Sequence, residues 1–390
     1  MLDLDKIRRE TPGIEHSAHL LACGSALMPQ CVVDAIVEHT LLEARIGGYE
    51  AHAQQADSLG GVYASVARHI GAGAHEIALM ENATVAWCHA FYALPLRPGA
   101  RILTCEAEYA ANYVAFLQRA KRDNLKIEVI PSDASGALDL AALEQTMDED
   151  VGLVAITWVP TNGGLVNPAA EVGKIARAHG VPYLLDACQA AGQMRINVDE
   201  LGCDFLSATG RKYLRGPRGT GFLYVKETWL DSLEPAMIDH FGAPWIAHDQ
   251  YALRDDARRF ETWENAYALR AGLGAAFDYA DAIGIDLIET RVRHLANHAR
   301  SLLSGMDQVE IHDLGDAPCG IVSFAVSGHQ PKAIVDGMTQ AGFAIGASDP
   351  ESTRLDSERR GLPIILRLAP HYYNTEDEID RAVAHLGTLI

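Results

Sequence analysis

The chain has 390 residues, of which 48% are apolar and 22% charged, and its formal net charge is −20 at pH 7. This length allows two or three domains around a large core. A strongly acidic surface repels phosphate backbones, so we expect no nucleic-acid partner. No apolar run reaches the roughly 18 residues that a membrane span requires, so we expect no membrane partner.

The cysteines predict a reducing compartment. They number seven, and no pair has the CxxC spacing of a zinc site or a redox dithiol. Residues 1–12 are charged and lack the apolar core of a signal peptide. We therefore predict a cytoplasmic protein with reduced thiols. We also predict no metal, because His16 and His19 match no ligand spacing such as HExxH.

Apolar runs bounded by turn residues alternate with amphipathic stretches through the first two thirds of the chain. In chain order the pattern predicts strand 101–105, helix 112–123, strands 126–130 and 153–158, helix 171–179, and strands 182–186, 205–208 and 221–225. This alternation predicts an α/β fold with a mostly parallel sheet.

A second pattern begins near residue 285. It predicts helix 287–306, strand 321–326, helix 331–341, strand 364–368 and helix 376–386, which together form a smaller α+β unit. We therefore predict a large domain of residues 15–285 and a small domain of residues 1–14 and 286–390. The charged stretch 347–360 is expected to be a solvated loop, with a mobile lid as the alternative.

An apolar strand ends in a carboxylate within Tyr183–Ala191. Asp186 closes the strand, and Gln189 follows three residues later. Ligands of open α/β sheets lie beyond the carboxyl ends of strands, where a carboxylate can pair with a cationic ring nitrogen. Asp186 could instead cap a following helix, and this segment alone favours capping.

A lysine stands just beyond another strand end, within Asp204–Gly221. Lys212 is followed by a Gly-Pro-rich turn and a further strand. Burial and the cationic neighbours Arg211, Arg215 and Arg218 lower an amine's pKa and free its lone pair for attack on an aldehyde. A phosphate-binding or solvated lysine is the alternative. The turn leads into a strand and not a helix, which excludes a dinucleotide-binding loop.

Asp186-Ala-Cys-Gln189, followed about twenty residues later by Ser-Ala-Thr-Gly-Arg-Lys212, resembles the class V aminotransferase family of fold-type I enzymes. That family includes cysteine desulfurases, isopenicillin-N-epimerase-like proteins, kynureninase-like enzymes and the C–S lyases of ergothioneine biosynthesis. The resemblance covers nearly the whole chain. It implies a mostly parallel seven-stranded sheet in the large domain, a small α+β domain, and pyridoxal 5'-phosphate (PLP) as cofactor.

The resemblance implies cofactor roles residue by residue. Lys212 would form the internal aldimine and then shuttle protons as base and acid. Asp186 would keep the pyridinium nitrogen protonated, and Gln189 would hydrogen-bond the phenolic oxygen. Further contacts are implied for a helix start that cradles the phosphate, a ring-stacking aromatic, a loop asparagine and a hydroxyl before the lysine: Asn82, Ala83, Thr84, Tyr109, Asn162 and Thr209. Ordinary N-capping is the alternative for Asn82 and Thr84.

The C-terminal third carries the substrate and subunit landmarks of the family. Arg367 stands where the family grips the substrate α-carboxylate by a bidentate pair. Residues 258–265 resemble the segment that crosses a dimer interface, so Trp263 and Asn265 are expected near the neighbouring subunit's phosphate. A homodimer with shared active sites follows from the resemblance.

The chain departs from cysteine desulfurases at one informative position. Those enzymes place a nucleophilic cysteine on a mobile loop shortly before the carboxylate-binding arginine, whereas residues 342–366 contain no cysteine. Cys319 lies earlier and is expected to be a buried structural thiol. Arg211 stands where desulfurases usually have histidine, and residues 45–51 and 371–375 resemble the ergothioneine-lyase and epimerase-like branch.

We therefore predict a PLP-dependent C–S lyase acting on a cysteine conjugate or sulfoxide. Lys212 would take the Cα proton, the quinonoid would expel sulfur from Cβ, and the aminoacrylate would hydrolyse to pyruvate and ammonia. Tyr49 and Glu50 are candidates to shape the sulfur-side pocket. The alternatives are a class V aminotransferase, an amino-acid epimerase, or a non-catalytic binding or regulatory homologue.

Overall fold

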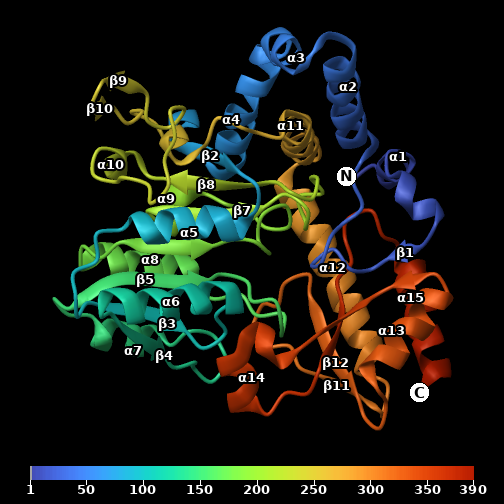
Figure 1. The fold of residues 1–390 in the computed structure, drawn as a ribbon. Coiled ribbons are helices and arrows are strands. Elements are labelled where there is room, and N and C mark those ends of the chain that lie inside the picture. Colours follow the sequence, from blue (N-terminus) through green and yellow to red (C-terminus); the bar gives the residue numbers. More distant parts are fainter. Residues whose placement is uncertain (1) are drawn as a thin grey trace.

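The computed structural model describes residues 2–390, so Met1, at which the predicted small domain begins, lies outside the described residues. A seven-stranded sheet forms its centre, in the order β2-β8-β7-β6-β5-β3-β4 (Figure 1). Strand β8 runs in the opposite direction to the other six strands of this sheet. The predicted mostly parallel α/β sheet is confirmed. The strands are β2 (Ile77–Met80), β3 (Arg101–Cys105), β4 (Lys126–Ile130), β5 (Val151–Thr157), β6 (Tyr183–Asp186), β7 (Phe205–Thr209) and β8 (Gly221–Val225).

The sheet is buried on both faces, which explains why its strands are continuous apolar runs. Along β6, Leu184 packs with α5 (Ala83–Ala93) and α6 (Ala110–Asp123), while Tyr183 and Leu185 point to the opposite face. This alternation follows from the two-residue period of a strand. The opposite face is covered in part by α7 (Leu140–Thr146) and α8 (Ala169–Ala178).

Several helices near the N-terminus pack as a layer beside β2 and β8, at the top of Figure 1. They were not predicted from the sequence. They are α2 (Gln30–Ile46), α3 (Gly48–Gln54), α4 (Ala56–Ile70) and, from later in the chain, α11 (Tyr267–Ile283). Short elements complete this part of the molecule: α1 (Leu4–Arg9), α9 (Val198–Leu201), α10 (Glu227–Leu230) and the hairpin β9 (Trp245–Ala247) and β10 (Gln250–Tyr251).

The C-terminal third forms a separate antiparallel sheet in the order β11-β12-β15-β14, at the lower right of Figure 1. Helices α12 (Ile285–Leu303), α13 (Pro331–Gln340) and α15 (Glu376–Leu389) contribute to its hydrophobic core. The strands are β11 (Val309–Ile311), β12 (Val322–Val326), β14 (Gly346–Ser348) and β15 (Ile365–Leu368). The N-terminal strand β1 (Ala18–His19) pairs with β13 (Phe343–Ala344) of this unit. The domain limits given above stay a prediction.

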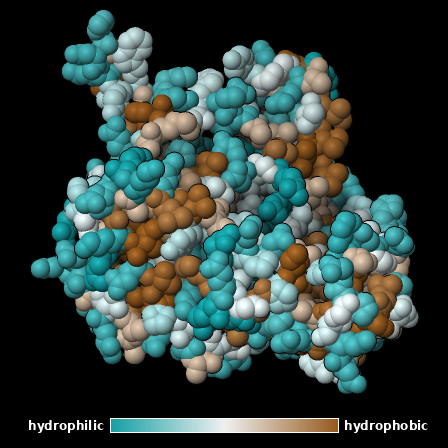
Figure 2. Space-filling view, turned by 60° about the horizontal axis from the view of Figure 1, so that its bottom comes forward, coloured by the Kyte–Doolittle hydropathy of each residue, from teal (hydrophilic) through white to brown (hydrophobic). Residues whose placement is uncertain are grey.

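The surface is mixed in polarity. Figure 2 shows a broad apolar area on the left of the face that it presents, surrounded by hydrophilic side chains. Val114 and Leu117 of α6 are among the large apolar residues that the chain exposes. Among residues 2–390, no helix has both the length and the apolar composition that crossing a bilayer requires.

Candidate active site

Lys212 stands in a tight loop between β7 and β8. The loop closes on itself, because the Gly216 N–H donates to the Gly210 carbonyl at 2.7 Å and the Thr209 hydroxyl donates to the Thr220 carbonyl at 3.2 Å. Lys212 is half-buried. No carboxylate of the described chain forms an ion pair with its amine. The amine is therefore not committed to a structural salt bridge.

The three arginines near Lys212 have separate environments. Arg211 donates to the Gly24 carbonyl, and Arg218 is exposed. Arg215 is fully buried among tyrosine rings and donates to the Leu27 carbonyl at 2.7 Å. Arg215 is thus a structural link to the N-terminal segment, a role that the sequence did not indicate.

Asp186 ends β6 as a buried carboxylate, with 5% of its surface exposed. Its Oδ1 accepts the Cys188 backbone N–H at 2.9 Å, and its Oδ2 accepts Asn112 Nδ2 at 2.9 Å. The first bond closes a turn, so the capping alternative is partly realised, although no helix follows. Within residues 2–390 no cationic side chain forms an ion pair with Asp186. A buried carboxylate that has only neutral donors suits a ligand that brings its own cation.

Tyr109 lies at the start of α6, where its backbone N–H donates to Glu108 Oε1 at 2.8 Å. Burial raises the pKa of its phenol, and the charges of Asp186, Arg211 and Arg367 act on it. The structure therefore brings the predicted stacking residue to the same place as the predicted ring-nitrogen and carboxylate partners.

Cys188 is a site thiol that the sequence reasoning did not single out. Burial, followed by the Asp186 charge, raises the pKa of this thiol to about 12, while the nearby Lys212 and Arg211 charges lower it. Its neighbours place it in the candidate site. Its place within Asp186-Ala-Cys-Gln189 was the available signal, because that segment was already assigned to the cofactor.

The predicted phosphate cradle lies at the start of α5. Asn82 Oδ1 accepts the Val85 N–H at 2.9 Å, so Asn82 does cap the helix. The N–H groups of the first helical turn have no intrahelical acceptor and can meet an anion. Gly221 holds this turn against the strands. A Cβ at position 221 would lie 2.8 Å from the Asn82 carbonyl carbon and 2.6 Å from the Ala208 oxygen. Thr209 pairs with Gly221 in register, so its hydroxyl lies beside the cradle.

Gln189 faces the N-terminal segment. Its Nε2 donates to the Cys23 carbonyl at 3.1 Å, and its buried Oε1 has no partner among the described residues. The same segment contacts the lysine loop, because the Ala26 N–H donates to the Arg211 carbonyl at 2.9 Å. Residues 23–27 thus line the candidate site, and no motif had indicated this.

Arg367 lies in the middle of β15, opposite Ser323 of β12 and Gly346 of β14. One of its terminal nitrogens donates to the Thr161 hydroxyl at 2.7 Å and to the Thr161 carbonyl at 3.2 Å. Its buried Nε has no partner in the part of the chain that the structure describes. Like Asp186, Arg367 lacks an oppositely charged partner, which suits a carboxylate ligand.

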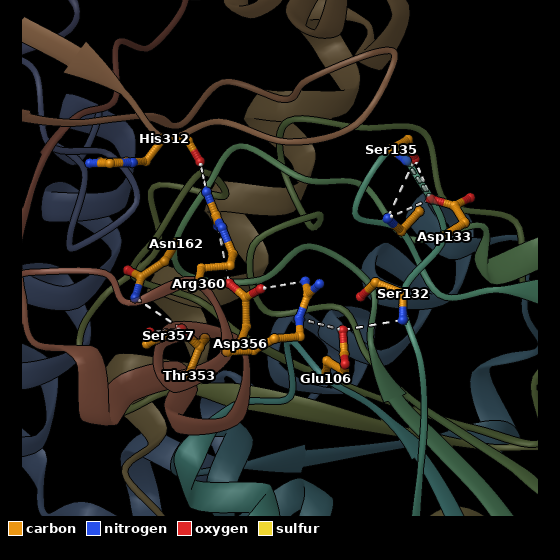
Figure 3. Close-up of polar contacts among 12 residues, drawn as sticks. Glu106, Ser132, Asp133, Ser135, Asn162, His312, Thr353, Asp356, Ser357 and Arg360 are labelled. Atoms are coloured by element: carbon orange, nitrogen blue, oxygen red, sulfur yellow. Dashed lines mark hydrogen bonds and ion pairs between the residues drawn. The ribbon is translucent and has the colours of Figure 1, made fainter.

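Asn162 has a different neighbour from the one predicted. Its Nδ2 donates to the Thr353 hydroxyl at 3.1 Å, at the left of the cluster in Figure 3. It is Thr161, the preceding residue of the same loop, that contacts Arg367. The cofactor contact assigned to Asn162 stays a prediction.

The expected solvated loop at 347–360 is instead folded, so this prediction was wrong. It forms β14, a short 3-10 helix (Pro350–Thr353) and α14 (Arg354–Arg360). Thr353 and Asp356 are buried. Charged side chains alone suggested solvent, but here they pair with one another and with the large sheet.

Figure 3 shows how α14 is fixed. Asp356 pairs with Arg360 at 3.1 Å, and Arg360 donates to the His312 carbonyl at 2.7 Å. Arg359 pairs with Glu106 at 2.9 Å, and Glu106 also accepts the Ser132 N–H at 3.1 Å. The segment before Arg367 is therefore attached at several points.

Four further predicted residues make no contact with Lys212 in the described part of the chain. Trp263 stacks on His240 at 5.1 Å and is 48% exposed. Asn265 lines a cavity of about 290 Å³ together with Thr220, which is the last residue of the lysine loop before β8. Tyr49 and Glu50 lie on α3, and Tyr49 is 79% exposed. The partner-subunit roles of Trp263 and Asn265 and the pocket roles of Tyr49 and Glu50 stay predictions.

The residues present fit PLP. A free lysine amine, a buried carboxylate without a cation, an open helix start and an arginine without a carboxylate converge from different elements. Each of the two charged side chains lacks the partner that a PLP–amino-acid pair would supply. Together with the sheet, they define a PLP-dependent enzyme of fold type I.

Comparison with known proteins agrees. The family model described as Aminotransferase class-V matches residues 18–382. A cysteine desulfurase of Dickeya dadantii is 31% identical over 98% of this chain and 96% of that protein. A probable cysteine desulfurase of Methanothermobacter thermautotrophicus is 28% identical over 96% and 95%. The chain belongs to the class V aminotransferase family, and its cofactor is PLP.

Solved structures share the whole fold. The apo cysteine desulfurase from Thermococcus onnurineus NA1 superposes with a TM-score of 0.93 at 26% identity, covering 100% of this chain and 98% of that one. The cystine C–S lyase C-DES, solved with its product cysteine persulfide, gives 0.87 at 22% identity, covering 96% and 98%. At that identity the second likeness supports the fold alone.

Proposed function

We propose that this protein is a C–S lyase that eliminates sulfur from Cβ of a cysteine-derived amino acid, such as cystine, a cysteine S-conjugate or a sulfoxide. The observation that carries the proposal is the segment before Arg367. It contains no cysteine, and α14 attaches it to Glu106 and His312. A desulfurase needs a thiol on a mobile loop there to accept sulfur, and this segment supplies neither.

Two thiols near the site, Cys188 and Cys319, are poor sulfur acceptors. Cys188 keeps its proton at neutral pH, because burial and Asp186 raise its pKa to about 12. Burial raises the pKa of Cys319 to about 12 as well, and Arg300 donates to its carbonyl at 2.7 Å. Since the thiolate is the reactive form of cysteine, both are inert. The relatives named as cysteine desulfurases therefore support a cysteine-derived substrate more than they support transfer of its sulfur to an enzyme thiol.

The chain's own residues fit an elimination. When bound, PLP withdraws electrons from the substrate Cα. Asp186 would keep the ring nitrogen protonated, and Arg367 would fix the substrate carboxylate. Lys212 Nζ would accept the Cα proton, the Cβ–S bond would break, and the sulfur would leave with the bonding electrons. Hydrolysis of the released aminoacrylate with water gives pyruvate and ammonium.

The experiment incubates the purified PLP-loaded enzyme with cystine and several cysteine S-conjugates, without any 2-oxo acid. We expect pyruvate, ammonium and a sulfur product in equal amounts, and none of them from Lys212→Ala. A requirement for a 2-oxo acid would instead indicate an aminotransferase. Exchange of the Cα hydrogen with inversion and no net consumption would indicate an epimerase. Absence of a Schiff-base absorbance after PLP addition would indicate a non-catalytic homologue.

We also propose a homodimer in which Trp263 and Asn265 reach the partner's phosphate. The exposure of Trp263 and of the β9–β10 hairpin supports an apolar contact there, since Trp245 is 74% and Ile246 61% exposed. Light scattering on the purified chain tests whether it is a dimer.

We propose the cytoplasm as the compartment of this protein, because all seven cysteines are free.

A further inference from the structure

Two buried carboxyl groups in the site share one amide. Glu108 is 3% exposed and Asp186 is 5% exposed. Asn112 Nδ2 lies 2.8 Å from Glu108 Oε1 and 2.9 Å from Asp186 Oδ2. A primary amide nitrogen has two protons, so Asn112 donates one to each carboxyl. Asn112 thus links Glu108 to Asp186, the carboxylate that is predicted to face the cofactor.

No positive charge of the described chain compensates Glu108. The groups that face it are Thr104 and Cys105 from β3, Thr157 from β5, Tyr183 from β6, and the backbone of Tyr109 from α6. The ionisable members of this set, Cys105 and Tyr183, are acids, and Asp186 adds a like charge. Two ionised carboxylates bridged by one neutral amide, without a cation, are strongly unfavourable in a buried site.

The hydrogen bonds of Glu108 are asymmetric. Oε1 accepts three donors, which are the Tyr109 N–H at 2.8 Å, Asn112 Nδ2 and the Thr157 hydroxyl. Oε2 has only Thr104 Oγ1 at 3.0 Å and Cys105 Sγ at 4.0 Å. The Thr104 hydroxyl can accept as well as donate, so this pattern suits a carboxylic acid whose proton is on Oε2 and is donated to Thr104 Oγ1, while its carbonyl oxygen accepts the remaining donors.

We propose that Glu108 is a positioning residue held as a neutral acid, which orients Asn112 so that Asp186 is the single full negative charge facing the cofactor's ring nitrogen. The role of Asp186 toward the ring nitrogen rests on the proposed PLP site, whereas the protonation of Glu108 is independent of it. Burial raises the pKa of Glu108 to about 7, because burial and the charge of Asp186 outweigh the hydrogen bonds from Thr157, Asn112 and the Tyr109 N–H, which lower it. The neutral acid thus persists to near-neutral pH.

Infrared spectroscopy on the full chain, as purified and after cofactor removal, tests the protonation. The difference between wild type and Glu108→Gln should show a protonated carboxyl C=O stretch at pH 6 that shifts in D2O and disappears as the pH rises through about 7. In Asp186→Asn the band should disappear at lower pH, because the like charge is gone. Glu106→Gln, which removes a glutamate already paired with Arg359, is the matched control and should leave the band in place.

PLP binding tests the positioning role. Glu108→Gln keeps the shape and neutrality of the acid, so its PLP affinity should stay within about 3-fold of wild type, whereas Glu108→Ala should bind about 10-fold more weakly, the effect of one lost buried hydrogen bond. A missing carboxyl band, or a band unchanged in Asp186→Asn, would overturn the protonation. Equal weakening in Gln and Ala variants would overturn the positioning role. The infrared result needs no turnover, so failure of the lyase assay leaves it intact.

Discussion

The Cys188 backbone N–H donates a 2.9 Å hydrogen bond to Asp186 Oδ1, and this contact holds the Cys188 thiol close to a buried carboxylate of the site. The carboxylate contributes to raising the pKa of the thiol to about 12. The same turn therefore orients Asp186 and suppresses Cys188 as a nucleophile. A cysteine in a sulfur-processing site would otherwise suggest persulfide formation.

Replacing Cys188 by alanine should therefore preserve elimination. The backbone bond to Asp186 remains, so we expect pyruvate formation within about 3-fold of wild type, a difference of about 0.65 kcal/mol at most. Mass spectrometry of the wild-type enzyme after turnover should show no persulfide on this residue. A loss of two orders of magnitude together with a persulfide at Cys188 would contradict the lyase proposal and restore a desulfurase.

Replacing Arg367 should weaken substrate binding and leave the cofactor in place. A charge-assisted hydrogen bond contributes about 1.5–3 kcal/mol, so Arg367→Ala should lower kcat/KM by about 10- to 100-fold. Arg367→Lys should recover only part of this, because a lysine cannot form the bidentate pair. The Schiff-base absorbance should be unchanged in both variants. Arg381→Ala, on the exposed face of α15, is the control and should keep wild-type kinetics.

Most of the large sheet could be predicted from the sequence, because its strands are short apolar runs bounded by turns. The 221–225 strand matches to the residue. One helix of the layer that was not predicted, α11, was missed for a local reason. Helix α11 contains Gly272 and Gly274, which disfavour a helix in isolation. Their role is visible only in the fold, because a Cβ at either would lie 2.6 Å from Ile36 or 2.8 Å from Val62.

Some residues of the candidate site could likewise be predicted from the sequence, and others could not. Asp186 and Lys212 follow predicted strand ends, so their strand pattern and spacing were informative. Glu108 and Asn112 flank the predicted stacking residue Tyr109 in the sequence, but their role depends on β3, β5 and β6 being neighbours, which no local pattern reveals. The anchoring of α14 likewise depends on Glu106, some 250 residues earlier in the chain.

The buried acid predicts a pH dependence of stability. The pKa of Glu108 is about 7 in the folded chain against an ordinary 4.5. Well below pH 4.5 Glu108 is protonated in both the folded and the unfolded state, and its contribution to the free energy of unfolding is then fully present. As the pH rises to 7, the unfolded state releases the proton first, so the folded state loses up to about 3 kcal/mol. Urea unfolding of cofactor-free protein should show this loss in wild type and not in Glu108→Gln. Parallel pH profiles for the two would contradict it.

Gly192 controls the position of the lysine loop. Its φ is +88°, and a Cβ there would lie 2.3 Å from the Tyr213 carbonyl carbon and 2.3 Å from the Leu214 nitrogen, directly after Lys212. Gly192→Ala must therefore strain its own backbone and displace the loop. We expect a loss of at least about 2 kcal/mol in the free energy of unfolding, together with reduced PLP loading. Gly180→Ala is the matched control, because φ is +66° there but no atom lies within 4 Å of the added Cβ. This variant has the strained backbone of Gly192→Ala without its steric clash, so it should load PLP fully. Equal loading in the two variants would show that the loop can move without consequence for Lys212, and the close approach of Gly192 would then have no part in holding the amine.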